Sequence, residues 1–181
     1  MPLHPGPHNI PKTLYLLFKI VISKMLQQKF IDLAFRYSSD SELIYGLWEE
    51  IENAYKSQKR YYHTLLHLEN LFNEISVCKN QIEDWNMVQF AIFYHDIVYN
   101  VLKKNNEEKS AIMAELNLSL LKVPVLDIKK CKELILATRN HKVHIDRDIN
   151  YFTDADLSIL GKDWASYDIY IQQIRKEYGI Y

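Results

Sequence analysis

Glycine and proline are scarce in this chain. It contains 4 glycines and 5 prolines among 181 residues, and all but one of the prolines fall within the stretch 1–11. Strands need a turn at each end, and turns draw heavily on these two residue types. The scarcity therefore excludes a body of many short strands and predicts an all-helical one. It also leaves no glycine-rich phosphate loop, which excludes ATP binding by a P-loop.

Cysteine and basic charge are also limited. The spacing of the 2 cysteines, Cys78 and Cys131, matches neither a zinc ribbon nor a redox Cys-x-x-Cys motif. Each lies in an apolar helical pattern, so we expect core thiols in a reducing compartment. The net charge is -1 and the pI is about 6.7. Nucleic-acid-binding domains usually carry a clear basic excess, so we expect no nucleic-acid partner.

Long hydrophobic runs are missing as well. The apolar stretch 13–23 (TLYLLFKIVIS) is interrupted by Lys19, and a membrane-spanning helix needs about twenty residues. The stretch also lacks the charge pattern and the cleavage site of a secretory signal. We therefore expect an amphipathic or core helix here, no membrane partner and a cytoplasmic protein.

Composition divides the chain into three parts. Residues 1–11 (MPLHPGPHNIP) are expected to be a disordered leader, since proline disrupts helix and sheet alike. Residues 12–39 are expected to form an N-terminal helical extension, and residues 40–181 one domain. The expected fold class is all-α, a single bundle of about six to eight helices. Apolar periodicity predicts helices from Asp40 or Ser41 to about Ile51, and then over about 62–77, 83–98, 106–121, 126–138, 155–160 and 164–178.

Histidines and aspartates gather at the ends of these predicted helices. His63 and His67 are four residues apart on the helix expected over 62–77, so they should share a face. His95 and Asp96 end the most apolar helix, where a buried carboxylate needs a partner such as a divalent ion. The sequence Asp-Ala-Asp at 154–156 begins the next short helix. Together these residues form a candidate metal site.

Each residue also has an ordinary structural explanation. The pair of histidines can simply flank a helix start, Asp96 can cap the next turn and Asp154 can be an N-cap. His141 and His144, in the polar connection 139–150, are solvated loop side chains if taken alone. The combination favours a site because every member falls at a helix end.

In this order His67, His95-Asp96 and Asp156 resemble the H…HD…D signature of the HD-domain superfamily of metal-dependent phosphohydrolases. The chain is most similar to the subgroup of predicted HD-type metal-dependent phosphohydrolases, over roughly 41–178, about three-quarters of its length. Relatives of this kind typically continue through further helices after the last block, so we expect a C-terminally truncated domain. The blocks that carry the resemblance are Arg60-x-Tyr62-His63-x-x-x-His67, Phe93-Tyr94-His95-Asp96-Ile97-Val98-Tyr99, Asn106-Glu107-x-x-Ser110-Ala111, Ala137-Thr138-x-x-His141, Asp154-Ala155-Asp156-Leu157-x-Ile159-Leu160-Gly161 and Ile174-Arg175-Lys176-Glu177-Tyr178.

The resemblance implies that one divalent metal ion is bound by His67, His95, Asp96 and Asp156. Such a mixed nitrogen and oxygen set suits Mn, Fe, Co, Ni or Zn, and Mg is also allowed. A second ion would draw on His141 and His144. Asp96 would also hold the attacking water.

Roles for further residues follow from the same resemblance. Glu107 is a candidate general base, with a favourable first-turn position in the helix dipole as the alternative. His141 would bind phosphate, donate a proton to the leaving group or help to hold a second metal ion. His63 would face the same cleft as a substrate-binding group. Further candidates for phosphate binding, each with a plain surface charge as the alternative, are Arg60, Lys109 and Arg139.

The expected function is hydrolysis of a phosphomonoester or phosphodiester bond in a small phosphorylated metabolite, such as a nucleotide. One alternative is a catalytically silent metal-binding module that acts as a sensor or scaffold. Another is an all-helical interaction protein with incidental histidines. The sequence does not indicate the oligomeric state.

Overall fold

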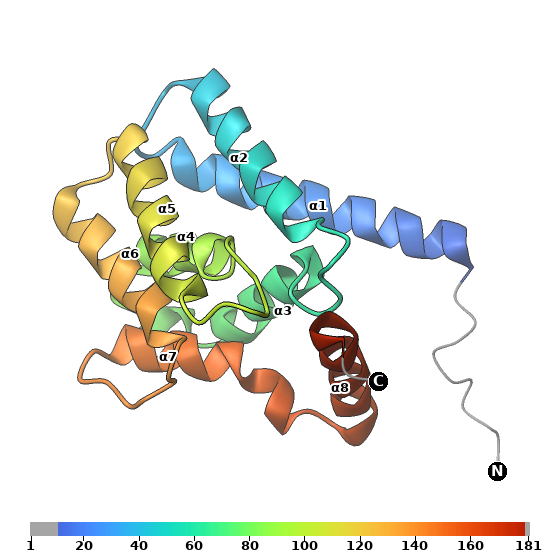
Figure 1. The fold of residues 1–181 in the computed structure, drawn as a ribbon. Helices are drawn as coiled ribbons and strands as arrows, with labels where there is room; N and C mark the ends of the chain where they lie inside the picture. Colours follow the sequence, from blue (N-terminus) through green and yellow to red (C-terminus); the bar gives the residue numbers. More distant parts are fainter. Residues whose placement is uncertain (1–10, 180–181) are drawn as a thin grey trace, which may run out of the picture.

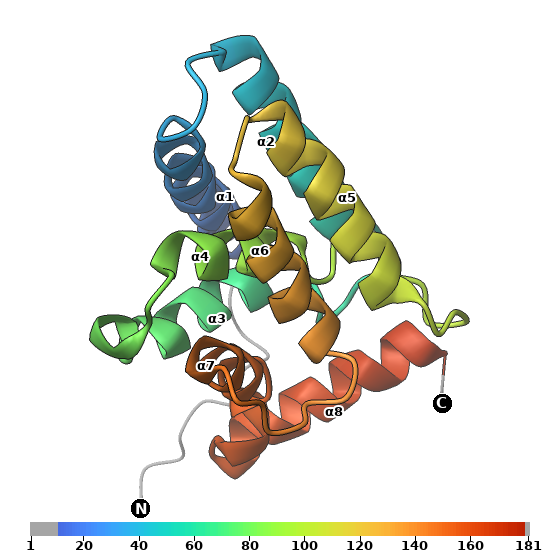
Figure 2. The same cartoon turned by 90° about the vertical axis from the view of Figure 1, so that its left-hand side faces the viewer.

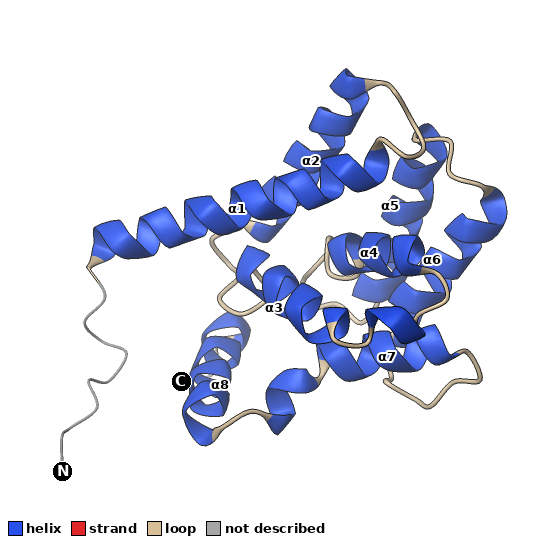
Figure 3. Cartoon of the chain, turned by 180° about the vertical axis from the view of Figure 1, so that it is seen from behind, coloured by secondary structure: helices blue, strands red, loops and turns tan. Residues whose placement is uncertain are grey.

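A computed structural model describes residues 11–179 and shows an all-helical architecture (Figures 1 and 3). Within these residues there is no strand, which confirms the all-α prediction. The expected leader lies almost entirely outside the described residues. The helices are α1 (Lys12–Ala34), α2 (Ser41–Tyr55), α3 (Leu65–Ser76), α4 (Trp85–Tyr94), α5 (Asn106–Leu120), α6 (Val125–Ala137), α7 (Arg147–Asp156) and α8 (Trp164–Tyr178), with short 3-10 helices η2 (Lys79–Gln81) and η3 (Ser158–Gly161).

Helix α4 forms the centre of the bundle because it is apolar on almost every side. It contacts α1, α3, α5 and α6, and α5 and α6 lie side by side over it (Figure 2). The side chains from Met87 to Tyr94 are buried, apart from that of Gln89. The helix ends at Tyr94, so His95 and Asp96 emerge from the middle of the core.

Helix α1 has two different halves. In the second half Phe30 is fully buried, with its ring centroid 6.2 Å from that of Trp48 in α2 and 5.2 Å from that of Phe93 in α4. The first half extends beyond the body of the molecule (Figure 1), and Phe18 is 51% exposed there. Half of the expected extension is therefore part of the domain core. None of the described helices is long and apolar enough to cross a membrane.

Several helix boundaries differ from the sequence prediction, and three of the differences move site residues. The helix expected to reach residue 98 ends at Tyr94, so His95 and Asp96 follow it instead of lying in its last turns. The helix expected from 62 begins at Leu65, so the prediction that His63 shares a helical face with His67 is wrong. The helix expected near 155 begins at Arg147, where the Asp146 carboxylate accepts a hydrogen bond from the amide of Asp148. The Asp-Ala-Asp sequence therefore ends α7 instead of starting a helix.

The packing of Phe30 predicts that the second half of α1 is needed for stability. Replacing Phe30 by Ala should lower the free energy of unfolding by about 3 to 5 kcal/mol, because the substitution leaves a cavity between three helices. The matched control Phe18→Ala, in the exposed half of the same helix, should change it by less than about 0.5 kcal/mol. Urea denaturation followed by circular dichroism measures both. Equal losses in the free energy of unfolding of the two variants would contradict the conclusion that only the second half of α1 packs in the core.

Candidate metal centre

Four side chains from three parts of the chain converge on one buried point. His67 lies in the first turn of α3, His95 and Asp96 follow α4, and Asp156 ends α7. The Nε2 atoms of the two histidines are 3.1 Å apart. Oδ2 of Asp96 lies 3.2 Å from Nε2 of His95, and Oδ1 of Asp156 lies 3.3 Å from Nε2 of His67. The structure thus brings together all four residues implied as metal ligands.

These separations suit a metal ion. Nitrogen or oxygen ligands about 2.1 Å from an ion lie about 3 Å apart when they are adjacent in its coordination shell. The three shortest separations in the cluster are close to this value. His67, His95 and Asp96 each offer one potential ligand atom, and these three atoms lie within 4.8 Å of one another.

The hydrogen bonding of His95 turns its free lone pair towards the same point. Its ring is 1% exposed, and its Nδ1 atom lies 3.0 Å from the carbonyl oxygen of Ile92 in the last turn of α4. A carbonyl oxygen only accepts hydrogen bonds, so Nδ1 must donate and Nε2 carries the lone pair in the neutral ring. This arrangement, in which a second group fixes the tautomer, is typical of histidine ligands to metals.

The acidity of these groups indicates that the cluster favours a positive charge. Burial alone would lower the pKa of His95, but the nearby carboxylate of Asp96 raises it to about 9. Burial would raise the pKa of both carboxyl groups, yet the pKa of Asp96 is held well below its ordinary value, chiefly by the charge of His95. The pKa of Asp156 is likewise lowered, by hydrogen bonds from His141 and His67. Two ionised carboxylates in a buried site need a positive charge beside them, which either a protonated His95 or a bound cation can supply.

His141 contacts the opposite side of Asp156. Its Nε2 atom lies 3.1 Å from Oδ2 of Asp156, while Oδ1 of the same carboxylate faces the two core histidines. The backbone of His141 has a φ of 47°, in the left-handed region that few residues other than glycine adopt. The chain thus takes an unfavourable turn that directs this ring towards the site.

Sequence reasoning missed one residue of the site, Glu177 in α8. Its Oε1 atom accepts hydrogen bonds from the backbone amides of Tyr61, Tyr62 and His63 at 2.6, 2.8 and 3.0 Å. Its Oε2 atom lies 2.8 Å from Nδ1 of His63 and accepts a hydrogen bond from the hydroxyl of Tyr99. Glu177 belongs to the last of the sequence blocks that resemble HD-type phosphohydrolases, residues 174–178. Nothing in such a charged helical segment indicates that this one acidic residue is buried.

Several other predicted site residues lie elsewhere or are occupied. The guanidinium of Arg60 donates hydrogen bonds to the backbone carbonyls of His63, Asp96 and Ile97, so it holds the two site loops together. Arg139 forms an ion pair with Glu108. Within residues 11–179, no hydrogen bond or ion pair connects the four-ligand cluster to Glu107, Lys109 or His144.

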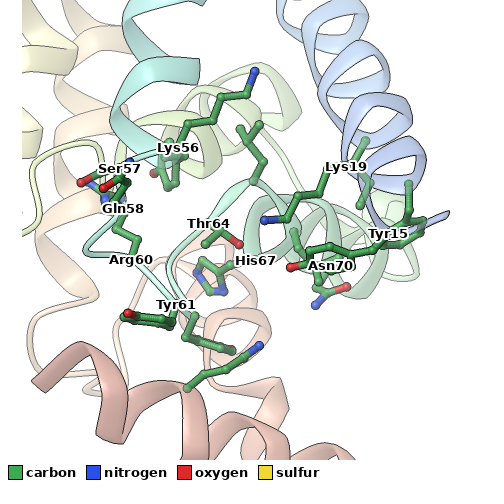
Figure 4. A pocket seen from close by; sticks show the side chains of 17 residues that line it. Tyr15, Lys19, Lys56, Ser57, Gln58, Arg60, Tyr61, Thr64, His67 and Asn70 are labelled. Atoms are coloured by element: carbon green, nitrogen blue, oxygen red, sulfur yellow. The ribbon is translucent and has the colours of Figure 1, made fainter. Parts of the chain in front are cut away.

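Two cavities flank the cluster. One, of about 480 Å³, lies between α3, η3 and α8 and reaches His67 and Asp156. The other, of about 500 Å³, lies between α3 and the first half of α1 (Figure 4). Only the first is lined by ligand residues from two different helices, so it is the better candidate for a substrate pocket.

Comparison with known proteins gives no further assignment. A scan against protein-family models found no match, and neither did searches of curated proteins and of solved structures.

The geometry predicts that the purified protein binds about one transition metal ion per chain. Replacing His95 by Ala removes a ligand and leaves an unpaired carboxylate beside it, so metal content should fall to near zero. The matched control His144→Ala, in the exposed loop before α7, should keep its metal. Inductively coupled plasma mass spectrometry of protein reconstituted with Mn²⁺ measures both. A wild-type protein without metal would rule out the site.

The bonds to Glu177 predict a specific pH dependence of stability. Burial would raise the pKa of Glu177, but its hydrogen bond with His63 contributes to lowering it from 4.5 to about 2. A carboxyl group whose pKa is depressed by folding stabilises the protein above its ordinary pKa, and this contribution is lost as the pH falls from about 4.5 through 2. Glu177→Gln should therefore lower the free energy of unfolding by about 2 kcal/mol at about pH 7.

The difference in free energy of unfolding between wild type and Glu177→Gln should be smaller at about pH 3. At that pH, below the ordinary pKa of a glutamate, the carboxylate of Glu177 stabilises the folded protein less than it does at neutral pH. Urea denaturation of both proteins at the two pH values measures the difference directly. Glu74→Gln is the control, because Glu74 forms its ion pair with Lys162 at the surface. A difference that does not change with pH would argue against an ionised Glu177.

Proposed function

We propose that the protein is a metal-dependent phosphohydrolase that acts on a small phosphorylated metabolite. The observation that carries the proposal is the buried set of four acceptor atoms at adjacent-ligand spacing, beside a cavity. Its residues His67, His95, Asp96 and Asp156 would hold one divalent ion. The resemblance of the sequence to HD-type phosphohydrolases supports the same activity.

A bound divalent ion would lower the pKa of a water molecule and neutralise charge on the phosphoryl oxygens. Asp96 would orient that water for attack on phosphorus, since one of its oxygens is free of the histidine contacts. His141 holds the second oxygen of Asp156 and stands at the edge of the site, where it would donate a proton to the leaving group. A second ion would require His141 as a ligand.

The lining of the smaller cavity supports a substrate with a polar and partly aromatic body. Asn70 and Gln173 offer amide groups for hydrogen bonding, and the rings of Tyr62 and Tyr170 meet edge to face with centroids 4.7 Å apart. Lys162 reaches the rim but is paired with Glu74. A nucleotide, which combines hydroxyl groups with a planar base, fits these groups.

The free cysteines support a reducing compartment such as the cytoplasm. Cys131 is buried in α6, whereas Cys78 is only half-buried and lies after the end of α3. Neither is part of a disulfide, and disulfides are rare in reducing compartments.

One observation favours the alternative of a catalytically silent metal-binding module. Arg60 is occupied by backbone carbonyls and Arg139 by Glu108, so neither is free to bind a phosphate. A sensor or scaffold would need the metal cluster alone.

Turnover separates these two functions. Protein loaded with Mn²⁺ should hydrolyse p-nitrophenyl phosphate or bis(p-nitrophenyl) phosphate, and Asp156→Asn should reduce the rate by about 100-fold or more, because it removes a charged ligand. The matched control Asp154→Asn makes the same change at an exposed position of the same helix and should keep the rate. Metal binding without hydrolysis of these esters or of nucleotides would favour the silent module.

A further inference from the structure

His63 is held rigidly although only one of its ring nitrogens has a hydrogen-bond partner in the described part of the chain. Nδ1 is bonded to Glu177, and the ring stacks on Tyr99 with centroids 4.3 Å apart and packs edge-on against Tyr62. The remaining nitrogen, Nε2, lies 3.8 Å from Oδ2 of Asp96. The side chain is 18% exposed, and this distance places Nε2 beside the candidate metal centre.

The partners of Glu177 determine which nitrogen of His63 carries a proton. Oε1 faces three backbone amides, and Oε2 faces the Tyr99 hydroxyl and Nδ1. An ionised carboxylate only accepts hydrogen bonds, so Nδ1 must be the donor whether the ring is neutral or charged. A carboxylate behind an imidazole commonly sets its tautomer and orientation in this way.

We propose that Glu177 is a positioning residue that directs Nε2 of His63 to the phosphate group of the substrate. There Nε2 shares a proton with a phosphate oxygen, next to the oxygens of Asp96. This inference rests on the proposed phosphohydrolase function, because that function supplies the phosphate. It identifies a connection from α8 to the metal centre, through a residue that is not itself a metal ligand.

The backbone amides around Glu177 make Glu177→Gln a sharp test. The three amides at 61–63 can only donate, so they must face the carbonyl oxygen of the new side chain. Its NH₂ group then faces His63, and Nδ1 has to become the acceptor. The variant should therefore keep the ring in place but move the proton from Nδ1 to Nε2.

Long-range ¹H–¹⁵N correlation spectra of the imidazole nitrogens measure this change. Nδ1 of His63 should carry a proton in the wild type and none in Glu177→Gln. Tyr99→Phe is the matched control, because it removes the other bond to the same oxygen of Glu177 and should leave the proton on Nδ1. A Glu177→Gln spectrum with the proton still on Nδ1 would overturn the proposal.

The functional half of the proposal is tested with inorganic phosphate and the Mn²⁺-loaded protein in isothermal titration calorimetry. Glu177→Gln should bind phosphate about 10- to 100-fold more weakly, because a neutral ring with its proton on Nε2 replaces a ring whose positive charge the carboxylate of Glu177 stabilises beside bound phosphate. His63→Asn is the second variant, and it avoids disturbing Glu177. The amide NH₂ of Asn can still donate to Glu177 as Nδ1 does, but nothing replaces Nε2, so the same loss is expected.

The outcomes distinguish the proposed role of His63 from the proposed phosphohydrolase function. Wild type that binds metal and phosphate, with both variants retaining wild-type phosphate affinity, overturns the role of His63 and leaves the phosphohydrolase function standing. Wild type that binds metal but no phosphate overturns the proposed contact. Wild type that binds no metal at all overturns the phosphohydrolase function itself, and the spectra then report separately on the Glu177 and His63 pair.

Discussion

Two buried carboxylates that face two imidazole nitrogens impose the main constraint on this structure. Asp96 and Asp156 have been removed from most of the surrounding water, and such charges are expensive unless they are paired and hydrogen-bonded. The fold offsets this cost by placing imidazole nitrogens against the carboxylates: His95 contacts Asp96, and His67 and His141 contact opposite oxygens of Asp156. The apolar helix α4 carries His95 into the centre of the bundle, where this residue is 1% exposed.

Around this cluster, two further charged groups are satisfied mainly by backbone atoms. Arg60 donates to carbonyl groups of both site loops, and Glu177 accepts from three consecutive amides. Each of these two side chains therefore stabilises irregular segments of the backbone that lie outside the helices. Neither residue is itself a candidate metal ligand.

Much of the fold, and the convergence of the four candidate ligands, could be predicted from the sequence. The apolar periodicity of α2 to α6 and α8 indicated their positions, and the order His67, His95-Asp96, Asp156 indicated residues that do converge. The start of α3 could not be predicted, because tertiary hydrogen bonds to Glu177 hold residues 61–63 in a turn. The function of these residues stays a prediction, and Glu107 and Lys109 lie on α5 without a bond to the cluster.

The link between Glu177 and His63 spans 114 positions of the chain, and this separation has a consequence for biosynthesis. The chain is made from its N-terminus at about 5 to 20 residues per second, so α8 is made after the other described helices. Helices α2 to α6 can pack while α8 is still being made, but His63 lacks its partner until α8 arrives. We expect the nascent protein to form most of its hydrophobic core before His63 is oriented by Glu177. The site is therefore completed late in the folding of each molecule.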